Sequence, residues 1–156
     1  MFMRILVAVD GSHVSYRALE EALKLVKDQQ AQVRIVHVVD TVPQEIGAYP
    51  VPDFDAYRQR SLTTGRKVLD EAIAVARRAD VDAEPALLEM ESSHPSIGIV
   101  EAAGRWPADL IVMGTHGRTG LLHLLLGSVA EGVVRDASVP VLLVRGTQTA
   151  AGEPAG

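Results

Sequence analysis

Short, uninterrupted runs of aliphatic residues recur along this chain, and amphipathic segments separate them. Ile5–Val9 is apolar at every position, which is typical of a strand buried on both faces of a parallel sheet. Val33–Val39 repeats this pattern, with Arg34 and His37 as its only polar residues. Between them, residues 15–27 carry apolar side chains three or four positions apart, which predicts a helix with Ser12 or Ser15 as its N-cap. The alternation of these two patterns predicts successive strand–helix–strand units.

The same alternation continues to the other end of the chain. Further strands are predicted at 83–89, 109–113 and 141–144, and further helices at 54–79, 95–106 and 129–135. The proline-rich residues 41–53 predict a surface loop, and residues 147–156 a disordered C-terminal tail. The sum is one α/β domain over residues 1–146, a five-stranded parallel sheet with helices on both faces, whose ligands bind at the carboxyl ends of the strands.

Charge and composition narrow the range of partners. The 15 basic and 20 acidic residues give a formal net charge of −5, which argues against nucleic acid or an anionic membrane as a partner. The absence of cysteine excludes disulfides and thiolate metal sites and fits a cytoplasmic location, and the five histidines lack zinc-site spacing. The longest uncharged stretch, residues 119–130, is shorter than the ~20 residues of a transmembrane helix, so neither a membrane span nor a secretory signal is expected.

A glycine-rich segment follows the predicted strand 109–113. Gly114 and Gly117 lie at its start, and Gly127-Ser128 stands directly before the next predicted helix. Glycines let successive backbone N–H groups approach phosphate oxygens, and a helix N-terminus favours an anion. Ser128 and Glu131 also match a capping box. The segment therefore predicts a phosphate-binding loop, with a tight turn and a helix cap as the simpler alternative.

The spacing Gly-x-x-Gly, nine residues and then Gly-Ser resembles the phosphate loop of the ATP-binding branch of the universal stress protein family. Further similar segments extend the resemblance over residues 4–145: Val9–Ser12, His37–Val38, Ala108–Met113 and Val139–Val141. The resemblance implies a doubly wound, Rossmann-like sheet of the adenine nucleotide alpha hydrolase-like type with strand order 3-2-1-4-5. It also implies ATP as the ligand and a homodimer formed through the last strand, Pro140–Arg145, which would be a sheet edge.

The same resemblance implies particular site residues. They are Ala8, Val9, Asp10, Val38, Met113, Gly114, Gly117, Arg118, Gly127, Ser128 and Val129. The first four would line the adenine and ribose region, the next two would flank the ribose, and the remainder would hold the phosphates, which bring Mg²⁺ or Mn²⁺ with them. Simpler alternatives stand beside two of these assignments: Asp10 caps the following turn, and Arg118 is merely solvated. His116, inside the same loop, either contacts phosphate or points into solvent.

Three features leave questions to the structure. Gly132 replaces an arginine that is common in the family, and glycine costs a helix about 1 kcal/mol relative to alanine. Residues 91–95 replace a short Gly-Asp-Pro-like turn of the family. The leucine-rich run Leu121–Leu126 is interpreted as a lid, a subunit contact or part of the monomer core.

Several functions remain open from the residues. A dimeric ATP-binding regulatory module in stress response is the first, and a slow ATP hydrolase is the second, although no Walker lysine follows a glycine and no catalytic residue is assigned. A nucleotide-free dimeric interaction protein is the third. Dinucleotide binding, prompted by Asp40, lacks the required glycine fingerprint after the first strand.

Overall fold

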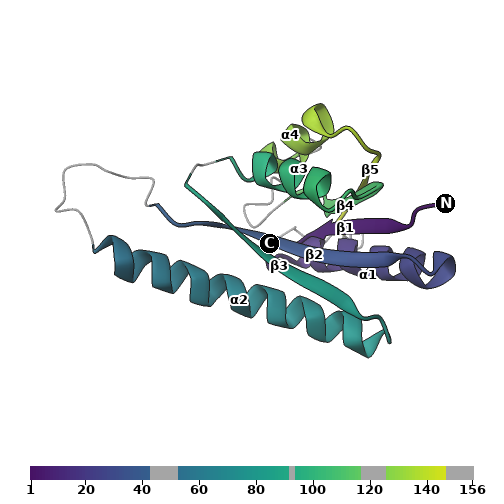
Figure 1. Ribbon diagram of the computed structural model, residues 1–156, viewed down its shortest axis with the longest axis horizontal. Helices are drawn as coiled ribbons and strands as arrows, with labels where there is room; N and C mark the ends of the chain where they lie inside the picture. The colour runs from purple at the N-terminus through teal and green to yellow at the C-terminus, as the bar shows by residue number, and fades with distance from the viewer. Residues whose placement is uncertain (43–52, 92–93, 117–125, 147–156) are drawn as a thin grey trace, which may run out of the picture.

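Five parallel strands form the central sheet, as the sequence pattern predicted, in the order β3-β2-β1-β4-β5 that the family resemblance implied (Figure 1). The computed structural model describes residues 1–42, 53–91, 94–116 and 126–146. In chain order the elements are β1 (Arg4–Ala8), α1 (His13–Gln29), β2 (Gln32–Asp40), α2 (Phe54–Arg78), β3 (Ala83–Met90), α3 (Pro95–Arg105), β4 (Leu110–Gly114), α4 (Ser128–Asp136) and β5 (Val141–Val144). Their order is the predicted one, and most ends differ from the prediction by one or two residues.

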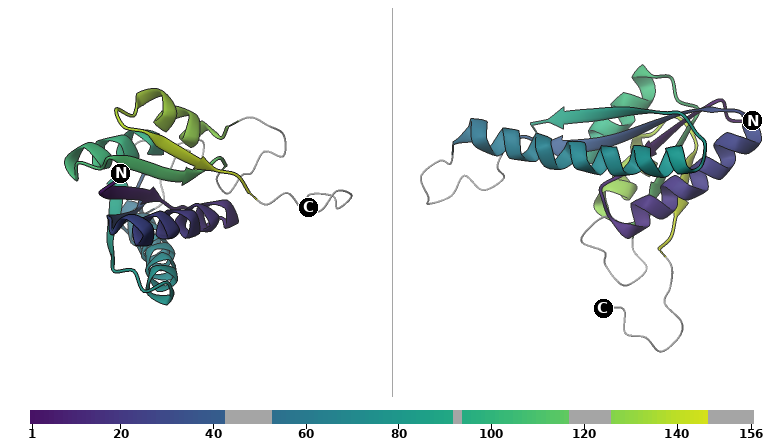
Figure 2. Two further views of the ribbon diagram at one scale, coloured as in Figure 1. Left: turned by 90° about the vertical axis from the view of Figure 1, so that its right-hand side faces the viewer. Right: turned by 90° about the horizontal axis from the view of Figure 1, so that it is seen from below.

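Helices cover both faces of the sheet (Figure 2). The side chains of Ile5 and Val7 in β1 are fully buried in the core that α1 and α2 form with one face, and Leu6 is fully buried in the core beneath α3 and α4. Successive side chains of a strand point to opposite faces, so a strand covered twice must be apolar at every position. This double burial explains the uninterrupted aliphatic runs of the sequence.

The first helix begins where a serine side chain can cap it. The Oγ atom of Ser12 accepts a hydrogen bond from the N–H of Ser15 at 3.2 Å, so Ser12 is the N-cap of α1. Ser15 is buried inside the first turn, and its hydroxyl donates to the carbonyl of Ser12 at 2.9 Å. Of the two predicted candidates, only Ser12 therefore caps the helix.

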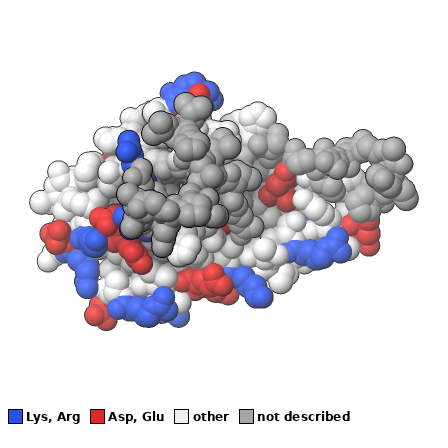
Figure 3. Space-filling model, turned by 180° about the vertical axis from the view of Figure 1, so that it is seen from behind, with Lys and Arg blue, Asp and Glu red and all other residues white. Residues whose placement is uncertain are grey.

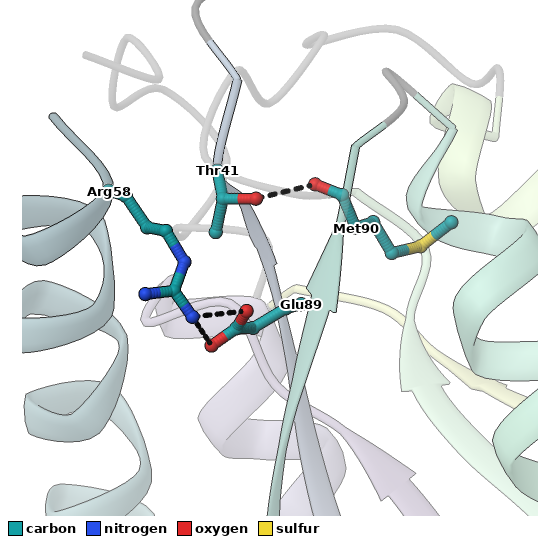
Figure 4. Close-up of polar contacts among 4 residues, drawn as sticks. All are labelled: Thr41, Arg58, Glu89 and Met90. Carbon is teal, nitrogen blue, oxygen red and sulfur yellow. Dashed lines mark hydrogen bonds and ion pairs between the residues drawn. The ribbon is translucent and has the colours of Figure 1, made fainter. Parts of the chain in front are cut away.

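Strands β2 and β3 extend beyond the other strands. β1 pairs with β2 only as far as Ala8 opposite Val36, whereas β2 and β3 stay paired to the end of both strands. At that end, the hydroxyl of Thr41 donates to the carbonyl of Met90 at 3.4 Å, and Arg58 of α2 forms an ion pair with Glu89 at 2.9 Å (Figure 4). The N–H of Thr41 donates to the same carbonyl at 3.1 Å. The two strands and α2 therefore form a wall that rises past the carboxyl end of β1.

The structure explains the unusual Gly132 in α4. A Cβ atom at this position would lie 2.5 Å from the Oγ and 2.7 Å from the Cβ of Ser96 in α3. Both distances are shorter than real carbon contacts, so α3 and α4 can pack this closely only because residue 132 has no side chain. The glycine weakens the helix locally but permits the contact between the two helices.

Several predicted segments lie outside the described residues. They are residues 43–52 of the predicted loop, residues 121–125 of the leucine-rich run and the predicted tail 147–156. Leu126, the last leucine of the run, is 37% exposed. In the ranges that are described, no helix has the length and apolar character needed to cross a bilayer.

Candidate functional site

A cavity of about 270 Å³ lies at the carboxyl ends of β1, β2 and β4. The N-terminal turns of α3 and α4 form its other side, and the buried Ser15 of α1 reaches it from the first loop. In the sheet order, β1 lies at the centre with β2 on one side and β4 on the other. The chain leaves β1 toward β2 and leaves β4 toward β5, so the cavity lies at the topological switch point where such sheets bind ligands.

Nine of the eleven predicted site residues line this cavity. They are Ala8, Val9, Asp10, Val38, Met113, Gly114, Gly127, Ser128 and Val129. The other two, Gly117 and Arg118, lie outside the described residues. The structure therefore brings to one cavity residues from three strand ends and one helix, which lie far apart along the chain.

One end of the cavity is apolar. Val36 and Val38 of β2 face Ile99 of α3 and Met113 of β4, and all four side chains belong to or pack against the same buried cluster. Pro95, in the first turn of α3, also lines this part. A flat apolar ring system would bury its faces here, because the surrounding side chains are branched or aliphatic.

The N-terminus of α4 forms another part of the cavity wall. Ser128 is the first residue of this helix, and the helix geometry leaves the N–H groups of Ser128, Val129 and Ala130 without intrahelical acceptors. All three residues line the cavity. Oriented N–H groups and the positive end of the helix dipole favour a bound anion.

The predicted capping box at this helix is wrong. The N-cap is Gly127, with extended backbone angles of φ −60° and ψ 157°, and no side chain caps the helix. The N–H of Glu131 bonds to the carbonyl of Gly127 as part of the regular helix ladder. Ser128 therefore stands one residue inside the helix, a position from which a serine does not close the box.

Thr115 brings the two ends of the glycine-rich segment together. Its carbonyl accepts a hydrogen bond from the N–H of Gly127 at 2.8 Å, and its own N–H bonds to the carbonyl of Val144 in β5 at 3.0 Å. Its hydroxyl lies 2.9 Å from Nδ1 of His116. The chain thus returns to the end of β4 before α4 begins, and His116 lines the cavity at this point.

Asp10 both shapes the first loop and lines the cavity. Its Oδ1 atom accepts a hydrogen bond from the N–H of Ser12 at 2.9 Å, which is the turn-capping role considered as the simpler alternative. The N–H of Asp10 lies 3.3 Å from Oγ of Ser15. A carboxylate has about four lone-pair positions, so capping the turn and binding a hydroxyl of a ligand are compatible roles.

Gly114 has a packing reason for lacking a side chain. A Cβ atom here would lie 2.6 Å from Cγ1 and 3.2 Å from the backbone carbonyl carbon of Val14, at the start of α1. From the sequence, we interpreted Gly114 as a residue that leaves space for a ligand. The contact with α1 alone already requires it.

Sequence reasoning missed part of the cavity wall. Pro95 and Ile99 lie one helical turn apart in α3, and Ala130 follows the predicted Val129 in α4. The apolar spacing of α3 was visible in the sequence, but the helix contributes to the cavity only because it crosses over the sheet toward the end of β2. The strand order is therefore needed to find these residues.

The face shown in Figure 3 carries no single dominant charge. Basic and acidic side chains are interspersed over the part of it that is described. Exposed ion pairs occur among the described residues; in α1, a hydrogen bond from Lys24 at 2.8 Å lowers the pKa of Glu21 from its ordinary value.

Solved structures of the same fold include nucleotide complexes. The hypothetical protein MJ0577 matches with a TM-score of 0.78 at 27% identity, over 96% of this chain and 99% of that one. A universal stress protein from Archaeoglobus fulgidus in complex with dAMP matches with a TM-score of 0.69 at 25% identity, over 91% and 97% of the two chains. A universal stress protein in complex with cAMP matches with a TM-score of 0.67 at 27% identity, over 92% and 97%.

Sequence comparison gives the same family. Universal stress protein YxiE of Bacillus subtilis is 36% identical over 151 residues, which cover 93% of this chain and all of that protein. A universal stress protein of Thermus aquaticus is 39% identical over 145 residues, again covering 93% of this chain and all of that protein. The model of the universal stress protein family matches residues 1–145. This chain therefore belongs to the universal stress protein family.

Proposed function

We propose that this protein binds ATP in the cavity at the carboxyl ends of β1, β2 and β4, and that it acts as a dimeric regulatory module in stress response. One observation carries the proposal: an apolar slot and a helix N-terminus open into the same cavity. The apolar slot suits an adenine ring, and the helix N-terminus suits a chain of phosphates. The domain that does this comprises residues 1–146, and we place it in the cytoplasm.

The adenosine end would lie against β1 and β2. Ala8 and Val38 would contact the adenine ring together with Val9, and Ile99 would close the other face of the slot. Asp10 would accept a hydrogen bond from a ribose hydroxyl while it keeps its bond to the N–H of Ser12.

The phosphates would extend toward α4. Met113 and Gly114 would flank the ribose, and the N–H groups of Ser128 and Val129 would bind phosphate oxygens. Gly127 would let the phosphates approach the helix without a side chain in the way. Gly117 and Arg118, outside the described residues, complete the proposed phosphate loop.

Two complexes among the structural neighbours support an adenine nucleotide as the ligand. Their bound molecules are dAMP and cAMP, which share the adenine ring and one phosphate with ATP. The choice of ATP over a monophosphate rests on the sequence resemblance, in which Gly117 and Arg118 extend the phosphate loop. A divalent cation would arrive on the phosphates, because magnesium keeps most of its water ligands. In the described residues, no cluster of acidic or histidine side chains offers a metal site of its own.

Slow hydrolysis of ATP is the second candidate function. The observation that favours it is His116, an ionisable group that lines the cavity next to the proposed phosphate loop. Hydrolysis needs a positioned water molecule and a stabilised leaving phosphate, which binding alone does not supply.

The dimer would form through the edge strand β5. Within the described residues β5 pairs with β4 alone, and the side chain of Leu142 is 38% exposed. An unpaired strand edge with an exposed apolar residue favours pairing with a second chain. A dimer that binds no nucleotide is the remaining alternative.

The substitution Gly127→Val tests the proposal directly. Valine adopts the backbone angles of Gly127 without strain, and the N–H that bonds to Thr115 is retained. The branched side chain would occupy the path of the phosphates, so we expect affinity for ATP, measured by calorimetry, to fall at least about tenfold, which corresponds to 1.4 kcal/mol.

Gly104→Val is the matched control. A Cβ atom at Gly104 of α3 has no neighbour within 4 Å, and this position is exposed and away from the cavity. Its affinity for ATP should match that of the unaltered protein. Equal affinities for all three proteins would refute the assigned site. Chromatography of nucleotide released from purified, denatured protein separates the two functions, because ADP that accumulates over time indicates hydrolysis.

A further inference from the structure

A second cavity, of about 440 Å³, lies on the other side of the carboxyl end of β2. It opens between this strand end and the N-terminal half of α2. Gly65 forms its floor, because α2 approaches β2 so closely there that a Cβ atom would lie 2.5 Å from Cγ2 of Val39. The wall formed by β2, β3 and α2 beyond the end of β1 therefore borders an open cavity next to the proposed nucleotide site.

Polar side chains of α2 face this second cavity at helical spacing. Tyr57 and Thr64 each lie three or four residues from the adjacent pair Arg60 and Ser61, so all four lie along one side of the helix. A helix side that faces a parallel sheet is normally apolar, as it is farther along α2 at Val68. Hydroxyl groups and a guanidinium on this side are the chemistry of a binding surface.

Two carboxylates stand opposite the helix. Asp10 ends the segment after β1, and Asp40 ends β2. Each holds its orientation through a turn, with Oδ1 of Asp10 bonded to the N–H of Ser12 at 2.9 Å and Oδ1 of Asp40 to the N–H of Val42 at 3.0 Å. Each carboxylate has about four lone-pair positions, so it accepts further hydrogen bonds in addition to these.

The lining carries both signs of charge. Two carboxylates and the guanidinium of Arg60 line the cavity, so no single sign of ligand charge is favoured by all of them. A neutral molecule with several hydroxyl groups would donate to the carboxylates and accept from Arg60 and the hydroxyls of α2. Tyr57, half-buried and also lining the cavity, carries an aromatic ring against which the C–H groups of a sugar would pack.

We propose that the second cavity binds a small neutral polyol with adjacent hydroxyl groups, such as a pentose. The site is separate from the proposed nucleotide cavity, but Asp10, His37 and Val38 line both. Because the two cavities share this wall, occupancy of one changes the affinity of the other by the same factor in both directions. The protein would thereby combine a nucleotide with a carbohydrate signal.

The probe is D-ribose, titrated into the nucleotide-free protein and followed by the backbone amide signals in NMR spectra. We expect saturable shifts of the amides of Ser61 and Thr64 with an affinity on the order of millimolar, as is usual for a ligand of this size. Putrescine and inorganic phosphate, added separately, should not shift these signals. Because no nucleotide is present, the outcome does not depend on ATP binding.

Thr64→Val tests the hydroxyl contact. The change keeps the shape of the side chain and removes one hydrogen-bonding group, so ribose should bind about fivefold more weakly, the usual effect of one hydrogen bond of about 1 kcal/mol. Thr63→Val is the matched control, because the hydroxyl of Thr63 bonds to the carbonyl of Gln59 and Thr63 does not line the cavity. It should leave the affinity for ribose unchanged.

Three results would overturn the proposal. One is the absence of saturable shifts at Ser61 and Thr64 with ribose at tens of millimolar. Another is stronger binding of putrescine or phosphate than of ribose, which would assign the site to a charged ligand. The last is equal weakening of ribose binding by Thr63→Val and Thr64→Val, which would place the contact elsewhere on α2.

Discussion

Substitution of Gly132 by alanine sets two effects of known size against each other. Helix propensity favours alanine by about 1 kcal/mol within a helix. Against this, the new Cβ atom would lie 2.7 Å from the Cβ of Ser96, and rotation of the serine hydroxyl does not move that atom. Ser96 and Gly132 are both buried, so α3 and α4 would have to move apart.

Overpacking of this kind costs about 1–3 kcal/mol, which exceeds the gain in propensity. We therefore expect Gly132→Ala to lower the free energy of unfolding by up to about 2 kcal/mol, measured by urea denaturation with an unchanged dependence on urea concentration. The affinity for ATP should fall as well, because α3 and α4 form two sides of the proposed nucleotide cavity.

Two further variants isolate the contact. Gly104→Ala, in an exposed position of α3 with no neighbour within 4 Å of a new Cβ, should gain stability of up to about 1 kcal/mol from propensity alone. In a Ser96→Gly background the obstacle is gone, so Gly132→Ala should become stabilising. If Gly132→Ala stabilises the unaltered protein as much as Gly104→Ala does, the proposed close packing of α3 and α4 is refuted.

Two other predictions concern the surface. Leu142→Lys, on the exposed side of edge strand β5, should convert the proposed dimer to a monomer in sedimentation experiments. The control Ile97→Lys, at a 43% exposed position of α3, should leave the protein a dimer. A Leu142→Lys variant that remains a dimer would place the contact elsewhere. The pKa of Glu21, lowered by Lys24, should rise toward its ordinary value of 4.5 in Lys24→Met, and an unchanged value in an NMR titration would contradict the contact. Because the pKa of Glu21 is lower in the folded than in the unfolded protein, the contact stabilises the fold at a pH above the unfolded-state pKa. This contribution is lost as the pH falls through the folded-state pKa. Since Glu21 is exposed, the melting temperature should respond little.

Much of the site followed from residues that act through their own backbone. Gly127, Ser128 and Val129 line the cavity at the start of α4, and a glycine-serine pair before an apolar helical pattern is the sequence signal that marks such a helix start. The capping box was wrong because it depends on which residue is the N-cap, and the return of the chain through Thr115 makes that residue Gly127. Boundaries depend on such tertiary contacts more than elements do.

The sequence by itself determined the class of fold, because a strand that is buried on both faces has to be apolar throughout and an amphipathic helix has to repeat its apolar residues every three or four positions. It did not determine which helices, strands and side chains contact one another. Pro95 and Ile99 joined the nucleotide cavity, Ser96 came to require a glycine at 132, and the polar side of α2 came to face Asp10 and Asp40 only through the packing of helices on the sheet. The spacing of apolar residues indicates which side of a helix or strand is buried. Which element packs against that side depends on contacts between segments that are distant in the chain.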